Sequence, residues 1–158
     1  MLRYRVELTP DDNGTTIAEV PGIPGTITFG RDKAEALDMA LDAALTMLVA
    51  AMDDGEDIPL ADAPQEGQPY IELPPMAVVK LAIYQAMKDQ GVTQLKMAAR
   101  LHTDAKSVRR LLDLDHKSRW DHLEMALESL GYQVKVQVEP SSLYPGFFGS
   151  RVKERTWA

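Results

Sequence analysis

The sequence contains no cysteine and only three histidines among its 158 residues. The absence of cysteine excludes disulfide frameworks, thiol catalysis and cysteine-based zinc sites. His116 and His122 lie six residues apart, so they would not share a helix face, and His102 is separate from both. We therefore expect neither a metal site nor a cofactor.

Long hydrophobic runs are also missing. No apolar run approaches the roughly 18 residues that a membrane span needs. The N-terminus, MLRYRVELTPDD, lacks the basic and then apolar layout of a secretory signal. Apolar residues make up 45% of the chain and charged residues 26%, which is typical of a globular protein. We expect a cytoplasmic protein with no membrane partner.

Positive charge is scarce in the first half of the chain. Residues 1–75 contain 4 Lys and Arg against 15 Asp and Glu, a net charge of -11. Residues 76–135 contain 10 against 7, a net charge of +3. A basic surface can approach phosphates, whereas an acidic surface suits a basic protein. The split predicts two different partners; the alternative is two solvated surfaces with uneven charge.

The beginning of the chain shows the period of short β-strands. Residues 2–9 alternate, and their apolar side consists of Leu2, Tyr4, Val6 and Leu8. Turn-forming segments at residues 11–14 and 21–25 separate this strand from two more, at residues 15–20 and 26–29. Three short antiparallel strands are therefore expected.

A long helix follows these strands. Asp32 can cap it, with Glu35 three residues on, and Gly55 ends it. An acidic loop rich in proline and glycine, at residues 53–69, then leads to a last strand at residues 70–73. The order strand, strand, strand, helix, strand predicts a small α+β unit over residues 1–73, with its helix on one face of the sheet.

The expected helix carries two apolar stripes. The first consists of Leu37, Leu41, Ala44, Leu45, Leu48 and Met52. The second consists of Ala36, Met39, Ala43, Met47 and Ala50. A helix that lies on one sheet needs a single apolar stripe, so we expect the second stripe to be buried against the other domain, a copy of the chain or a partner. The alternative is one broad core face.

A pair of prolines begins the second domain, which we expect to cover residues 74–139, because proline bars the backward extension of a helix. Its first helix ends at Gly91. Thr93 and Asp104 can then each cap a short helix. The inward positions of these two helices are Met97, Ala98, Leu101, Val108, Leu111 and Leu112. Two short helices with a small alanine at their crossing predict a helix-turn-helix motif.

The outward positions of the second short helix are residue types that bind DNA. Arg can grip guanine O6 and N7 in the major groove, whereas Lys, Ser and helix N-termini hold phosphates. A glutamine at the start of the preceding helix and a basic loop add further phosphate contacts. The DNA-binding candidates are Gln94, Lys106, Ser107, Arg109, Arg110, Lys117 and Arg119. The alternative is a solvated charged face on a helical bundle.

The second domain ends in a strand pattern. A closing helix carries Leu123, Ala126, Leu127 and Leu130. Next, Tyr132, Val134, Val136 and Val138 alternate with polar residues, and the domain offers no other strand as partner. Pairing with a second copy would satisfy the backbone, and a palindromic operator also calls for at least a dimer. The aromatic residues of the extension at residues 140–158 are Tyr144, Phe147, Phe148 and Trp157.

The second domain resembles the helix-turn-helix of the Xre and lambda-repressor type. The matching residues are Thr93-Gln94, Ala98 and Ser107-Val108-Arg109-Arg110. His102 stands where the turn of that family usually has glycine, so we expect a non-glycine turn geometry. The order of parts over residues 1–138 resembles a HicB antitoxin. The segments that carry this resemblance are residues 20–25, 28–30, 34–36, 58–60 and 70–74.

This resemblance implies a partial RNase H-like domain at residues 1–73 that blocks a HicA-type mRNA-cleaving toxin. It also implies that the second domain binds operator double-stranded DNA and represses the pair's own genes. We expect a non-enzymatic protein that forms a homodimer or tetramer. A toxin that handles RNA should be basic, so we expect acidic residues and the second apolar stripe to hold it. The toxin-binding candidates are Asp11, Asp12, Glu19, Met39, Ala43 and Met47.

Two other functions compete with this interpretation. A metal-dependent nuclease would use Glu7, Asp38 or Asp42, and Glu72 as ligands for two Mg²⁺ ions. Glu7, however, is expected on the sheet face opposite the helix, away from the other acids. A metabolite-sensing repressor would need an enclosed pocket, and a unit of about 70 residues with one long helix leaves little room for it.

Overall fold

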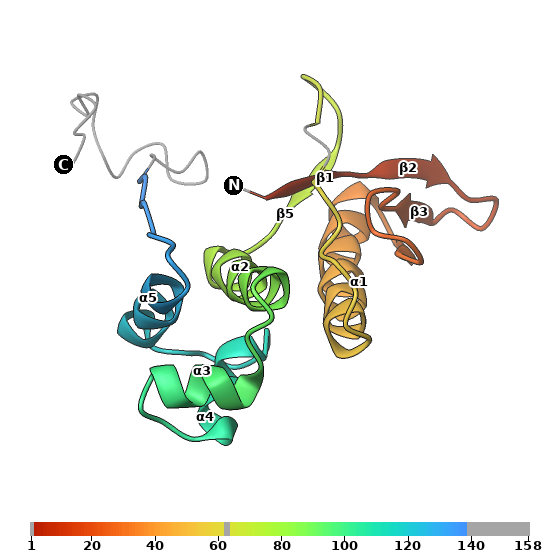
Figure 1. Ribbon diagram of the computed structural model, residues 1–158. Helices are drawn as coiled ribbons and strands as arrows, with labels where there is room; N and C mark the ends of the chain where they lie inside the picture. The colour runs from red at the N-terminus through yellow and green to blue at the C-terminus, as the bar shows by residue number, and fades with distance from the viewer. Residues whose placement is uncertain (1, 62–63, 139–158) are drawn as a thin grey trace, which may run out of the picture.

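The computed structural model describes residues 2–61 and 64–138 (Figure 1). Its strands are β1 (Arg3–Arg5), β2 (Glu7–Pro10), β3 (Thr16–Glu19), β4 (Ile27–Gly30) and β5 (Tyr70–Glu72). Its helices are α1 (Lys33–Asp53), α2 (Pro75–Asp89), α3 (Gln94–Arg100), α4 (Ala105–Leu112) and α5 (Trp120–Ser129). The expected α+β class, a small antiparallel sheet with one helix followed by a helical domain, is confirmed.

The first expected strand divides at Val6 into β1 and β2, which have different partners. β1 pairs antiparallel with β5, whereas β2, β3 and β4 form a three-stranded antiparallel sheet in that order. The Val6 N–H donates to the carbonyl of Pro69, the residue before β5 (2.9 Å), so the pairing of β1 with the β5 segment continues as far as Val6. The predicted alternation is confirmed, because Tyr4 and Val6 are buried and Leu8 is half-buried.

Helix α1 packs closely on the inner face of the sheet. The Asp32 carboxylate accepts from the Glu35 N–H (2.9 Å), as the capping pattern predicts. The Glu35 carboxylate accepts from the Arg31 N–H (2.6 Å), one residue before the cap. At the end of β4, a Cβ added to Gly30 would lie 2.3 Å from the Ala36 nitrogen. Only glycine fits there, so β4 and the first turn of α1 are in backbone contact.

The most buried line of α1 runs between the two stripes that the sequence predicts. It consists of Ala36, Ala40, Ala44 and Leu48. From the second stripe, Ala36 is covered by β4, and the Met47 methyl group lies 3.1 Å from the position of a Cβ on Gly25. The expectation that the whole second stripe needs an external cover is therefore wrong for these two residues, because the chain covers them itself. Met39 remains 43% exposed.

Helix α2 lies between α1 and the helices that follow it (Figure 1). Its residue Leu81 belongs to the core around the sheet, with Val78 packed against the same core. Ile83, Ala86 and Met87 belong instead to the core of the helical domain. α2 thus contributes to both cores, and the two domains are packed together rather than separated by a linker.

The helix-turn-helix forms as its capping residues predict. The Thr93 side chain accepts from the Lys96 N–H (3.2 Å), and the Asp104 side chain accepts from the Ser107 N–H (2.7 Å). All the predicted inward residues of α3 and α4 are buried or half-buried. The expectation of a non-glycine geometry in the turn is wrong, because His102 has a positive φ of +51°, the conformation that favours glycine. The left-handed conformation is retained, and a histidine adopts it at a steric cost.

Residues 132–138 form no strand within this chain. Val134 packs against the core of the helical domain, whereas Val136 and Val138 are 76% and 81% exposed. None of the described strands pairs with residues 132–138, so the predicted pairing with a second copy stays a prediction. The aromatic extension at residues 140–158 lies outside the described residues. Within the described part of the chain, no helix is long and apolar enough to cross a membrane.

Candidate DNA-binding and partner-binding surfaces

Helix α4 presents a basic face to solvent. Val108 and Leu111 point into the core, so Lys106 and Arg110, four residues apart, share the opposite face. Arg109 is exposed beside them, and Ser107 is half-buried. The hydrogen bonds from Ser107 lower the pKa of the Asp104 carboxyl, which keeps this capping residue ionised. The expected outward positions of the recognition helix are therefore at the surface.

The remaining DNA-binding candidates flank α4. Gln94 is exposed at the start of α3, which packs against α4. Lys117 is exposed in the loop after α4, where the Ser118 hydroxyl donates to the Arg110 carbonyl (3.2 Å). Arg119 is exposed but forms an ion pair with Asp121 (2.7 Å), and this pair lowers the pKa of the Asp121 carboxyl. Arg119 thus offers less free positive charge than Lys117.

A buried lysine supports this basic face and was missed by the sequence reasoning. Lys80 of α2 is fully buried, and its ammonium donates to the carbonyls of Arg110 (3.1 Å), Asp113 and His116 (2.6 Å). These carbonyls belong to the end of α4 and to the loop that carries Lys117. The sequence does contain a signal of this burial, because Lys80 lies three residues after Ala77 and three before Ile83, which places it on the buried face of α2.

The charge of Lys80 is partly compensated within its site. Burial lowers the pKa of its ammonium, while the carboxylates of Asp113 and Asp115 act in the opposite direction. An ammonium has three hydrogens, and the site supplies three carbonyl acceptors. The lysine therefore fixes the C-terminal end of α4 and the following loop to α2.

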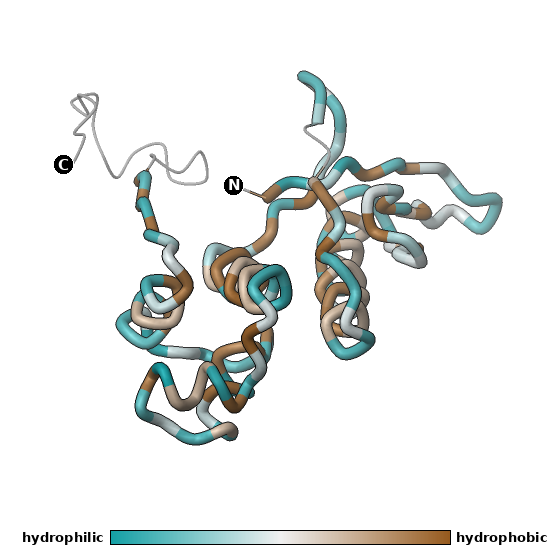
Figure 2. Tube along the Cα trace, viewed as in Figure 1, coloured by the Kyte–Doolittle hydropathy of each residue, from teal (hydrophilic) through white to brown (hydrophobic). Residues whose placement is uncertain are grey.

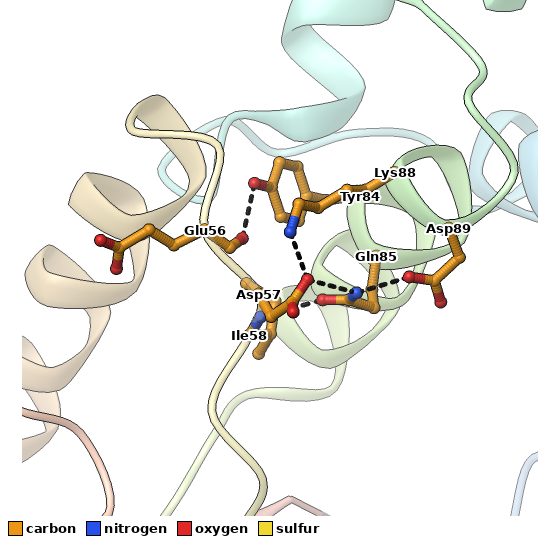
Figure 3. A network of polar contacts seen from close by, with 7 residues as sticks. All are labelled: Glu56, Asp57, Ile58, Tyr84, Gln85, Lys88 and Asp89. Atoms are coloured by element: carbon orange, nitrogen blue, oxygen red, sulfur yellow. Dashed lines mark hydrogen bonds and ion pairs between the residues drawn. The ribbon is translucent and has the colours of Figure 1, made fainter.

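A second polar network joins α2 to the loop after α1 (Figure 3). The Tyr84 hydroxyl donates to the Glu56 carbonyl (2.7 Å), and the Gln85 side-chain oxygen accepts from the Ile58 N–H (2.9 Å). Lys88 forms an ion pair with Asp57 and lowers the pKa of that carboxyl. Together with Leu81, this network holds the helical domain against the sheet domain.

The acidic toxin-binding candidates lie around the β2–β3 hairpin. Asp12 is exposed and Asp11 is half-buried in its turn, which projects from the sheet as a hydrophilic segment (Figure 2). Glu19 is exposed on β3 and faces away from α1, because its neighbour Ala18 faces the helix and is buried. These acids are therefore at the tip and on the outer face of the sheet.

The apolar toxin-binding candidates lie on the other side of the sheet, in α1. Met39 is exposed, whereas Ala43 and Met47 are half-buried. The structure does not bring Glu19 into one surface with these residues, because the sheet separates them. Two exposed apolar residues on the side of Glu19, Ile27 and Phe29 of β4, were missed by the sequence reasoning. The sequence does contain a signal of this surface, because threonine alternates with Ile27 and Phe29 along the strand and the two apolar residues therefore share one face.

The acids of the nuclease alternative are dispersed. Glu7 lies on the outer face of the sheet and pairs with Arg5 (2.6 Å), and Glu72 pairs with Arg3 (2.7 Å). Asp38 and Asp42 are exposed on α1, on the opposite side. Among residues 2–61 and 64–138, no three His, Asp or Glu side chains are placed to hold one metal ion.

Known proteins resemble this chain in sequence. The profile of a family described as "HicB_like antitoxin of bacterial toxin-antitoxin system" matches residues 3–82, which include the sheet domain and the first part of α2. "Antitoxin HicB 1" of Photorhabdus laumondii is 33% identical over 87% of this chain and 88% of its own length. "Antitoxin HicB" of Pseudomonas fluorescens is 32% identical over 88% and 95%. "Antitoxin HicB" of Escherichia coli K12 is 30% identical over 85% and 98%. With matches that extend through both domains, this chain belongs to the HicB-like antitoxin family of bacterial toxin–antitoxin systems.

Proposed function

We propose that this antitoxin neutralises a HicA-type mRNA-cleaving toxin through residues 1–73 and represses its own operon through residues 74–139. The observation that carries the proposal is the separation of charge in space. The domain with a net charge of -11 holds the sheet, whereas the basic helix α4 lies at the far end of the molecule (Figure 1). A basic toxin and a DNA duplex can therefore bind at different ends without competing.

The DNA-binding half has the features of a major-groove reader. Arg109 and Arg110 contact bases from α4, while Lys117 and the exposed Gln94 contact phosphates on either side. Lys80 holds the end of α4 and the Lys117 loop in fixed positions. The protein acts in the cytoplasm, where operator and mRNA are both found, and it acts by binding rather than by catalysis.

The functional unit is a homodimer or a tetramer. A single recognition helix makes too few base contacts for tight operator binding. The exposed valines at 136 and 138, and the alternation of apolar and polar residues over 132–138, support pairing with a second copy. Light scattering at micromolar concentration tests this, and a monomer would refute it.

The experiment that tests the whole proposal uses the full chain with its toxin and its operator. Arg109→Ala and Arg110→Ala should each weaken operator binding by about 1–3 kcal/mol if the arginine grips a guanine. Lys117→Ala should weaken specific and non-specific DNA about equally and reduce the salt dependence. All three variants should protect mRNA from the toxin as the wild type does. A wild-type chain that fails to protect mRNA would overturn the neutralising role.

A further inference from the structure

Strand β4 has its apolar and polar faces reversed. A half-buried strand normally turns its apolar residues to the core. In β4 the buried side carries Thr28 and Gly30, preceded by Thr26 at 1% exposure, whereas Ile27 and Phe29 point to solvent at 62% and 65% exposure. The close approach of α1 at Gly30 explains the small inward residues. It does not explain the large apolar residues outside.

The exposed residues of β4 continue into β3. In the register of the sheet, Phe29 lies opposite the half-buried Ile17, and Ile27 lies opposite Glu19. We call these four residues the outer patch. β4 is also the last strand of its sheet among the described residues, so one of its edges has no strand partner there. The outer patch therefore combines an apolar surface with a strand edge that another protein can contact.

The charge around the outer patch indicates which class of protein can bind it. No residue of the patch is basic, the nearby Arg31 is paired with Glu35, and Asp12 lies in the adjoining turn. A second copy would bring two domains of net charge -11 together, which electrostatic repulsion disfavours. A nuclease that grips mRNA must carry positive charge to hold phosphates. The patch is complementary to such a basic protein.

We infer that the outer patch, rather than the methionine side of α1, is where this antitoxin captures its basic mRNA-cleaving toxin. This inference rests on the proposed function and locates its interface. Ile27 and Phe29 provide the apolar centre, and Glu19 provides the acidic rim. Met47 serves the core of this domain instead, where it contacts the turn at Gly25.

The test measures the affinity of the full chain for the purified HicA-type toxin of its own operon. The double variant Ile27→Thr/Phe29→Thr keeps strand-forming residues and should lower toxin affinity by about 30-fold or more. Leu60→Thr, at a loop residue that is 91% exposed, is the matched control and should change nothing. Glu19→Lys should slow association, with an effect that shrinks as salt is raised. Operator affinity and circular dichroism should remain unchanged in every variant.

Two results would overturn the inference without affecting the proposed function. Met39→Gln could abolish capture while the β4 double variant binds normally, which would place the toxin on α1. Alternatively, the double variant could change the oligomeric state and leave toxin affinity intact, which would assign the outer patch to a second copy. By contrast, a wild-type chain that does not bind the toxin at all would refute the proposed function itself.

Discussion

Replacement of Lys80 by methionine tests whether one buried charge organises the proposed DNA-binding surface. Methionine keeps an unbranched apolar stem but removes the three bonds to the carbonyls of Arg110, Asp113 and His116. Bonds from charged donors contribute about 1.5–3 kcal/mol each, or roughly 5–9 kcal/mol together. The variant also avoids the burial of a charge, which costs several kcal/mol. We therefore expect a net loss of about 2–4 kcal/mol in the free energy of unfolding.

The loss should be visible in thermal unfolding and in DNA binding. For a chain of this size, each kcal/mol lowers the melting temperature by about 2–4 °C, so the expected decrease is roughly 5–15 °C. Below the melting temperature, operator affinity should fall by about tenfold or more, which corresponds to 1.4 kcal/mol, because the Lys117 loop loses its attachment to α2. Toxin affinity should be retained.

Lys88→Met is the matched control for this experiment. Lys88 lies on the same helix, but it is exposed and pairs with Asp57 at the surface. Its loss should change the free energy of unfolding by less than about 1 kcal/mol and leave operator affinity unchanged. If Lys80→Met behaved like Lys88→Met in both measurements, the ammonium would not be what holds the end of α4.

Three further predictions follow from local features of the structure. In the folded chain the pKa of Lys80 lies below its ordinary value of 10.5, so between these two pKa values the unfolded chain binds more protons than the folded one. The free energy of unfolding of the wild type should therefore rise with pH in this window, and its difference from that of Lys80→Met should widen as pH approaches 10.5. Urea titrations measure this difference, and a narrowing would contradict the argument. His102→Gly should stabilise the chain by about 0.5–1 kcal/mol, because glycine adopts a positive φ without strain; a lower melting temperature would show that the side chain is needed. Gly30→Ala should destabilise by about 2 kcal/mol or more, because its Cβ would collide with the backbone at Ala36; calorimetry that showed no change would mean that β4 and α1 separate easily.

The sequence by itself determined the local elements of this protein. Asp32, Thr93 and Asp104 cap their helices as their side chains predict, because a cap needs only a backbone N–H two or three residues away. The inward positions of α3, α4 and α5 follow from the helical period for the same reason. The family resemblance, which depends on the order of these elements, could therefore be stated from the sequence and was confirmed.

The tertiary structure decided everything that depends on which distant segments meet. The division of the first strand at Val6 follows from two separate partners, β5 and β3, that lie far apart in the sequence. The helical period places Lys80 on the inward side of α2, but the three carbonyls that accept from its ammonium lie at least 30 residues away, and no local pattern reveals them. The outward direction of Phe29 depends on the contact of Gly30 with α1, since that contact selects the face of β4 that turns inward. Side-chain period places residues on one of two faces, but only packing against another element decides which of them is left to solvent.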